Sequence, residues 1–137
     1  MTRPPDRTRS LDELEGAWPA PLPGATRLVT AVHAARRRPV GDLSVEELRV
    51  LIGQNVGLPY VLPLAVAVLR DDPTAEGDLY PGDLLSAVVT RHPAVWAAFP
   101  DLRHTLRLAL ASPTAPLPAL PPALRAGVDE FLTPRHL

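Results

Sequence analysis

The most closely spaced group of ionisable side chains in this 137-residue chain is a run of carboxylates that contains no basic residue. The five acidic residues of this run are Asp71, Asp72, Glu76, Asp78 and Asp83. The run lacks the alternating aspartates, the glycine and the closing glutamate of a calcium-binding loop. A positively charged protein partner suits it better, because complementary fields speed encounter and penalise wrong partners. The alternative is a solvated loop whose acids cap helices, Asp83 in particular.

The remaining reactive side chains show no catalytic or metal-binding pattern. The four histidines (His33, His92, His104 and His136) are widely spaced and form no ligand pair. The chain has no cysteine, which excludes disulfides and thiolate metal sites. No phosphate-binding glycine loop and no nucleophile elbow occurs. We therefore predict no catalytic residue, no metal and no cofactor.

The segments that precede and follow the acidic run are predicted to be helices. Strand-like alternation is nearly absent, whereas capping boxes occur at Ser10 with Glu13 and at Ser44 with Glu47. Apolar residues recur at helical spacing after the caps. We expect one helix after Ser10 and further helices over about 26–38, 44–56, 59–69 and 123–132. Two more are expected to begin with Pro81 in the first turn and with Asp101 as the cap. Gly57 is expected to end the 44–56 helix in a left-handed conformation.

Composition predicts one all-α domain, a bundle of short helices with an aliphatic core. Apolar residues make up 46% of the chain but aromatic residues only 4%. Five prolines in 112–122 predict an extended connector. The expected organisation is a disordered arm over 1–9, a helical domain over 10–111, and a Pro-rich connector with a short terminal helix over 112–137. The charged, Pro-rich start predicts no secretory signal.

One uncharged stretch, residues 50–69, has the length of a membrane span. Its interior contains Gln54, Asn55, Pro59 and Pro63, which would leave polar or broken backbone in lipid. Two buried helices meeting at Gly57 explain the same residues better, so we predict no membrane contact.

The net charge of −1 conceals an uneven distribution. Residues 1–40 carry a net +3, residues 41–100 a net −5, and residues 101–137 a net +1. The total predicts no general attraction to nucleic acid. Three consecutive arginines, Arg36 to Arg38, lie at the expected end of a helix, where the helix dipole favours cations.

The segment Glu76-Gly-Asp-Leu-Tyr-Pro-Gly-Asp-Leu-Leu85 resembles the immunity proteins of bacterial contact-dependent growth inhibition (CDI). Residues 48–58, 61–65, 10–18 and 37–40 are also similar to that family, so the resemblance runs from about Ser10 to about Leu110. Leu79 stands where the family pattern leads us to expect an aromatic residue, and the Pro-rich tail is additional.

The resemblance implies a cytoplasmic protein that binds one cognate toxin domain and blocks it without turnover. Many such toxins are nucleases with basic active sites that hold phosphate, so acidic side chains could mimic that charge. The toxin contacts expected on this basis are Glu76, Asp78, Tyr80, Asp83, Asp71 and Asp72. Tyr80 would then be an aromatic anchor, although it could equally fasten Pro81 to the core.

Two other classes of function stay open at this point. A helical scaffold or regulatory protein could act through protein partners, or through self-association in which the apolar stretch 50–69 forms the dimer interface. Of the two oligomeric states, we expect the monomer. An enzyme is the third possibility, and it has no recognisable site to support it.

Overall fold

The computed structural model describes residues 7–111 and 120–133, and in this part of the chain every regular element is a helix. The elements are α1 (Leu11–Glu15), α2 (Arg27–Arg36), the 3-10 turn η1 (Val40–Asp42), α3 (Val45–Gly53), α4 (Leu58–Asp71), α5 (Asp83–Val89), α6 (Pro93–Ala97), α7 (Pro100–Ala111) and α8 (Pro122–Leu132). The predicted all-α class is confirmed.

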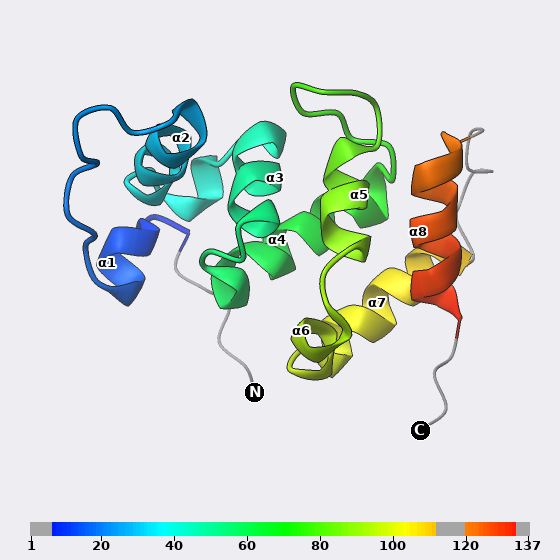
Figure 1. The fold of residues 1–137 in the computed structure, drawn as a ribbon. Coiled ribbons are helices and arrows are strands. Elements are labelled where there is room, and N and C mark those ends of the chain that lie inside the picture. Colours follow the sequence, from blue (N-terminus) through cyan, green and yellow to red (C-terminus); the bar gives the residue numbers. More distant parts are fainter. Residues whose placement is uncertain (1–6, 112–119, 134–137) are drawn as a thin grey trace.

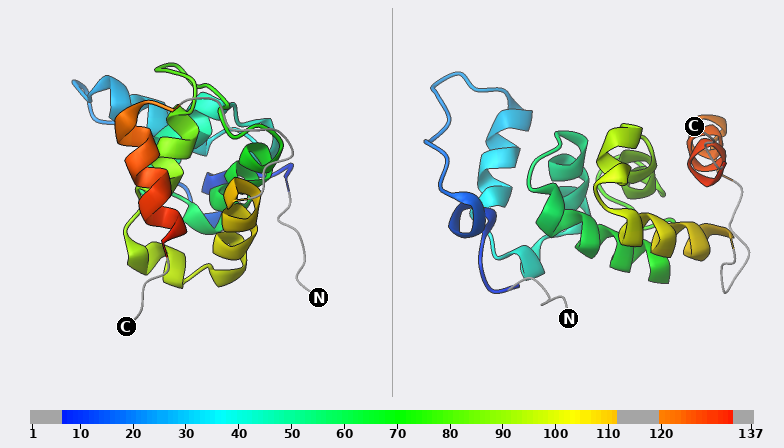
Figure 2. Two further views of the ribbon diagram at one scale, coloured as in Figure 1. Left: turned by 90° about the vertical axis from the view of Figure 1, so that its right-hand side faces the viewer. Right: turned by 90° about the horizontal axis from the view of Figure 1, so that it is seen from below.

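The helices form two layers (Figures 1 and 2). In the first layer α2, α3, α5 and α8 stand side by side in that order, and each packs on the next. The second layer consists of α4 and α7, which pack on each other and on the first layer. α4 is apolar around most of its circumference and buries Val61, Leu62 and Ala65 completely, because it packs on α3 and α5 of the first layer as well as on α7.

Local sequence signals set most of the helix starts. Ser10 and Ser44 both form complete capping boxes with Glu13 and Glu47, as predicted. Thr26 caps α2 by accepting the amide of Val29 at 3.1 Å.

Three expected helix boundaries were wrong. α3 ends at Gly53 rather than near Val56, and Gly57, in the left-handed region, precedes α4 instead of ending α3. α3 ends because Asn55 adopts the left-handed conformation (φ 56°), so that the Val56 amide donates to the Leu51 carbonyl at 2.9 Å. The Arg91 guanidinium also donates to the Gly53 carbonyl at 3.2 Å and to Asn55 Oδ1 at 3.1 Å. Burial lowers the pKa of this guanidinium.

The other two boundaries differ by one or two residues. Pro81 lies before α5, in an isolated bridge with Glu76, rather than in the first turn of the helix. α7 begins at Pro100, so Asp101 belongs to its first turn and is not its cap. A short helix, α6, was not predicted; His92 caps it by accepting the amide of Ala94 at 3.0 Å.

The ends of the chain lie partly outside the described residues. Of the segment expected to be an arm, residues 7–9 lie against η1, where the carbonyls of Arg7 and Arg9 accept the amides of Gly41 and Val40 at 2.9 Å. Residues 1–6 and the connector 112–119 fall outside the described part. No helix among the described residues is long and apolar enough to span a bilayer.

Arg36 joins α2 to α1 at the N-terminal end of the molecule. The sequence placed it at the end of a helix, where the helix dipole favours cations, and in the structure its side chain is only 1% exposed. Its guanidinium donates to Asp12 Oδ1, Glu15 Oε1 and the Gly16 carbonyl, each at 2.9 Å. It also stacks 4.2 Å from the centre of the Trp18 ring. All of its charge is thereby satisfied by α1 and the segment that follows α1.

Replacing Arg36 should destabilise the protein strongly. An Arg36→Met variant keeps the apolar stem but leaves two carboxylates and a carbonyl without their donor, which we expect to cost about 3 kcal/mol of unfolding free energy. Urea unfolding followed by circular dichroism measures the loss. Arg37→Met, at the exposed neighbouring position, is the matched control and should change stability by less than about 0.5 kcal/mol. Equal effects of the two variants would contradict this account of Arg36.

Candidate functional site

The acidic loop, defined here as residues 72–82, connects α4 to α5 and projects beyond the first layer (Figure 1). Asp72 starts it by accepting the amide and the hydroxyl of Thr74, both at 3.3 Å. The chain then reverses, so that the Gly82 amide donates to the Thr74 carbonyl at 3.1 Å. The two arms of the loop are therefore held together across its base.

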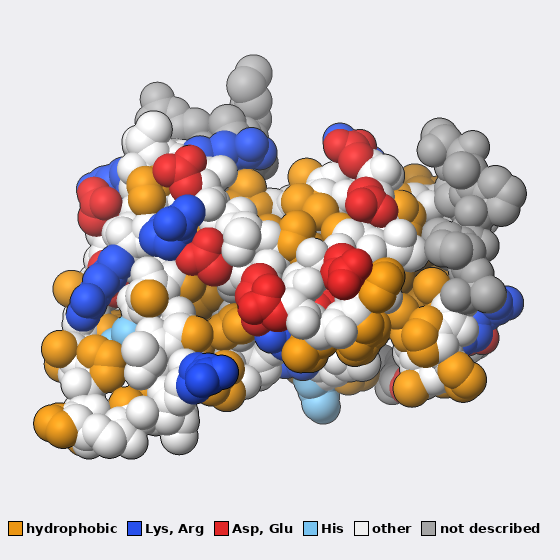
Figure 3. Space-filling view, turned by 90° about the horizontal axis from the view of Figure 1, so that it is seen from above, with side chains coloured by type: hydrophobic (Ala, Val, Ile, Leu, Met, Phe, Trp, Pro, Cys, Tyr) orange, Lys and Arg blue, Asp and Glu red, His pale blue; other side chains and the backbone are white. Residues whose placement is uncertain are grey.

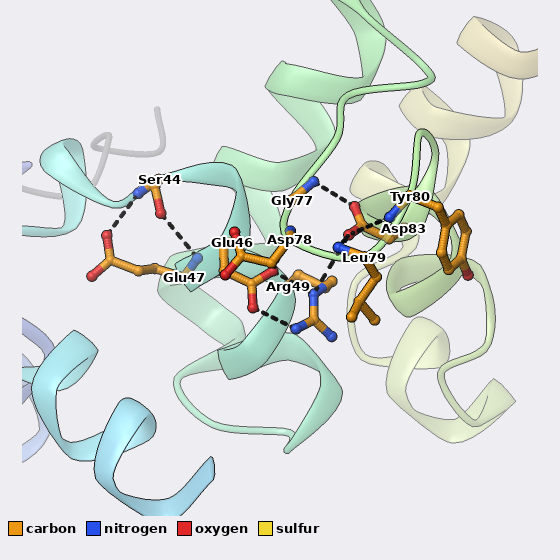
Figure 4. A network of polar contacts seen from close by, with 9 residues as sticks. All are labelled: Ser44, Glu46, Glu47, Arg49, Gly77, Asp78, Leu79, Tyr80 and Asp83. Carbon is orange, nitrogen blue, oxygen red and sulfur yellow. Dashed lines mark hydrogen bonds and ion pairs between the residues drawn. The ribbon is translucent and has the colours of Figure 1, made fainter. Parts of the chain in front are cut away.

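The carboxylate of Asp83, the first residue of α5, organises the tip of the loop (Figure 4). It accepts the amides of Gly77 at 2.6 Å and Leu79 at 3.0 Å, and that of Tyr80 at a longer 3.5 Å. The residue is only 2% exposed. A buried carboxylate is tolerated here because it supplies acceptors to amides that no regular element pairs.

A second anchor joins the loop to α3. Glu46 Oε1 accepts the Asp78 amide at 2.9 Å and the Arg49 Nε at 2.7 Å. The same Arg49 Nε lies 3.8 Å from Asp83 Oδ2, so one guanidinium serves the carboxylates of two helices. The hydrogen bond from Arg49 lowers the pKa of Glu46, and the same bond raises the pKa of Arg49. The loop is thus fixed to both α3 and α5.

Gly77 is required by this close packing. A Cβ atom at this position would lie 2.6 Å from Glu46 Oε1 and 3.0 Å from Asp83 Oδ2, the two oxygens that hold the loop. Any side chain here would push apart the carboxylates that determine the loop conformation.

The structure brings the expected contact residues together but divides them into two groups. Asp71, Asp72, Glu76 and Asp78 are exposed around the loop, and Tyr80 is 37% exposed. Figure 3, which looks down on this side of the molecule, shows acidic side chains over the middle of the face with hydrophobic side chains beside them. Asp83 belongs to the second group, since its carboxylate lies inside the loop.

The burial of Asp83 corrects its expected place as an exposed charge or a cap of its own helix. Its oxygens accept amides that precede it in the chain, from residues 77–80, rather than those of α5. These amides lie three to six residues before Asp83, so the loop folds back on this carboxylate in a small ring. The sequence alone does not reveal these contacts.

Sequence reasoning missed three residues of this site. Glu46 and Arg49 form an i,i+3 pair of the kind that is common on helix surfaces, and nothing in the sequence connects them to a loop some 30 positions later. Leu79, at the tip, is 63% exposed, although it is a large apolar residue. Only its departure from the expected aromatic residue drew attention to it.

The site combines ionisable groups with exposed apolar side chains. Its ionisable groups are engaged in holding the loop or face solvent, and no three potential metal ligands come together in the described part of the chain. A rigid, exposed loop that combines carboxylates with apolar side chains has features common in protein-binding surfaces.

Comparison with known proteins identifies the family of the chain. A sequence model of the CDI immunity proteins matches residues 13–106, a range that begins within α1, includes α2 to α6 and the acidic loop, and ends within α7. The chain belongs to this family, and the predicted resemblance is confirmed. Membership places it among toxin-neutralising immunity proteins and implies a non-enzymatic inhibitor. No curated protein matches the sequence significantly.

The lowered pKa of Glu46 predicts a pH-dependent contribution to stability. Because the folded carboxyl has a pKa below its ordinary value of 4.5, it stabilises the fold above that pH, and the contribution is lost as pH falls through the lower folded pKa. We expect Glu46→Gln to lower the unfolding free energy at pH 7, and the difference from wild type to shrink progressively below about pH 4.5. Urea unfolding at a series of pH values measures this. A difference that stays constant down to pH 2.5, well below the ordinary pKa of 4.5, would contradict it.

Proposed function

We propose that this protein neutralises a cationic, nuclease-type CDI toxin domain by docking the acidic loop over its active site. The inhibitor acts in the cytoplasm of the cell that produces it, as a monomer and without turnover. Support for the partner's chemistry comes from the sign of the exposed charge, since nuclease active sites are basic in order to hold phosphate.

The observation that carries the proposal is that the exposed carboxylates are not neutralised by their own protein. The side chains of Asp71 and Glu76 make no ion pair or hydrogen bond with another described residue. Asp78 adds a third exposed carboxylate beside an arginine that already serves Glu46 and Asp83. A partner with positive charge would therefore meet unpaired negative charge.

The anchoring of the loop supports tight binding as well as attraction. A surface loop that must become ordered on binding loses conformational entropy, which weakens the complex. Here the hydrogen bonds to Asp83 and Glu46 already hold the Gly77, Asp78 and Leu79 amides in the free protein. The carboxylates are therefore presented in one arrangement before the toxin arrives.

Apolar side chains at the tip complete the surface. Leu79 and Tyr80 lie next to the carboxylates and are exposed, so they can enter a pocket that the charged residues surround. Binding energy in protein interfaces is concentrated in such central apolar residues, while surrounding charges steer association. We assign Leu79 and Tyr80 the role of anchor and the carboxylates the role of steering.

The steering role predicts a kinetic effect. The double variant Glu76→Gln/Asp78→Asn should lower the association rate constant with the cognate toxin domain by about tenfold at low salt, and flatten its salt dependence. Stopped-flow or surface plasmon resonance measurements report both. The matched control is Asp101→Asn/Asp129→Asn, which removes two exposed carboxylates from α7 and α8. If control and loop variants lost the same rate, steering by the loop would be wrong.

The anchor role predicts the opposite kinetic pattern. Leu79→Asn removes an exposed apolar side chain while preserving the backbone amide that Asp83 accepts, so stability should change by less than about 0.5 kcal/mol. Dissociation of the complex should become about tenfold faster, with little change in association. Leu108→Asn, at another exposed leucine, is the control and should leave the dissociation rate constant unaltered. Unchanged dissociation in the Leu79 variant would exclude it as an anchor.

A further inference from the structure

Helix α8 lies beyond the part of the chain that matches the CDI immunity family, since the match ends at residue 106 and the helix begins at Pro122. It forms the outer end of the first layer, where it packs on α5 and on α7 (Figure 1). Leu124, Val128 and Phe131 recur at helical spacing and are all buried. Because α5 begins where the acidic loop ends, α8 packs close to the base of this loop.

The first buried residue of α8 meets the last residue of the acidic loop. A Cβ atom at Gly82 would lie 2.7 Å from Cδ2 of Leu124, so this methyl group packs directly on the Gly82 backbone. Glycine suits the position for a second reason, since its φ of 92° is in the left-handed region. Leu124 is only 3% exposed, and the contact is therefore shielded from water.

Gly82 joins the acidic loop to α5. Its amide donates to the Thr74 carbonyl at 3.1 Å, which closes the base of the loop, and its carbonyl accepts the Ser86 amide at 2.9 Å in the first turn of α5. The next residue is Asp83, whose carboxylate holds the tip of the loop. A shift of Gly82 would therefore disturb both the closed base and the carboxylate that organises the tip.

The first turn of α5 depends on its neighbours for its position. The helix has 7 residues, and isolated helices of this length are not stable in water. No side chain of the described residues caps it, and the Asp83 carboxylate turns back to the loop amides instead. Leu84 and Leu85 fasten α5 to the core, and Leu124 supplies the packing at Gly82 itself.

The opposite end of α8 is fastened to the second layer. The Arg107 guanidinium of α7 donates to the Leu132 carbonyl at 2.9 Å, at the end of the helix where the dipole favours a cation. The Phe131 ring lies edge-to-face against Trp96 of α6, with the ring centres 5.2 Å apart. Leu124 therefore projects from a helix that is held at both ends.

We propose that α8 is a positioning element for the acidic loop. Leu124 holds Gly82, and thereby places the Asp83 carboxylate where the loop amides donate to it. The side chain acts through Gly82 and needs no contact with a partner protein. Its consequence for toxin binding rests on the proposed function, whereas the positioning itself is a property of the free protein.

Hydrogen exchange of single amides, followed by nuclear magnetic resonance, tests the positioning without the toxin. The amides of Gly77, Leu79 and Gly82 are bonded within the folded loop, so they exchange when the loop opens. Leu124→Ala removes the methyl groups that pack on the loop base and should accelerate these three amides about tenfold or more. Leu11→Ala, which truncates a fully buried leucine of α1, is the matched control. It should leave their exchange within about twofold of wild type, because local opening does not require global unfolding.

Two outcomes would overturn the positioning role of Leu124. One is unchanged exchange of the loop amides in folded Leu124→Ala, and the other is an equal acceleration in Leu11→Ala. If Leu124→Ala does not fold, Leu124→Val removes only one methylene and should give a smaller acceleration at the same amides. No acceleration in this milder variant would also contradict the proposal.

Affinity for the cognate toxin domain separates this proposal from the proposed function. Leu124→Ala should weaken the complex about tenfold, because the loosened loop has to become ordered again on binding, while Leu11→Ala should bind as wild type does. Isothermal titration calorimetry measures both. Faster loop exchange together with unaltered affinity would overturn the docking of the acidic loop on the toxin, and the positioning by α8 would stand.

Discussion

The proposed toxin-binding surface depends on a buried carboxylate, that of Asp83, whose oxygens need hydrogen-bond donors. Asp83 cannot reach water, and its oxygens are satisfied only if the preceding loop folds back and turns its amides toward them. Glu46 and Arg49 complete the arrangement from α3, so the loop conformation is a consequence of how α3 packs on α5. An exposed, acidic connection between two helices would otherwise sample many conformations. Here it has one, and its remaining carboxylates point outward.

Burying ionic groups is also how the opposite end of the molecule is built. Arg36 gathers Asp12, Glu15 and a carbonyl around one guanidinium. These contacts join α1 to α2 in addition to the apolar core that both helices share. A 137-residue chain with few aromatic residues and many prolines has short helices with limited apolar faces. Buried, fully paired charges hold such pieces in one arrangement, because any displacement would leave an ion without its partner. Buried, paired ionic groups thus contribute both to the stability of the helical domain and to the conformation of the acidic loop.

The sequence predicted the parts of this structure that depend on near neighbours. Both capping boxes, the all-α class and the order of the main helices follow from residues three or four positions apart. Two failures have different causes: the left-handed residue that ends α3 is Asn55 rather than Gly57, and Asp83 meets Arg49 from a different helix. For the candidate site, the sequence identified the acidic residues but not which of them face solvent. That division depends on which carboxylates the loop amides reach, and no local pattern encodes it.

The central claim is that the outward carboxylates of the acidic loop meet the toxin, and carboxyl footprinting tests it directly. Exposed carboxylates of the free protein and of its toxin complex are labelled with a carbodiimide and glycine ethyl ester, and the modified peptides are quantified by mass spectrometry. We predict that labelling of Asp71, Glu76 and Asp78 falls strongly in the complex, while that of Asp101 and Asp129 is unaltered. Loop carboxylates that are labelled equally in the free and bound protein, with protection confined to another face, would contradict the account.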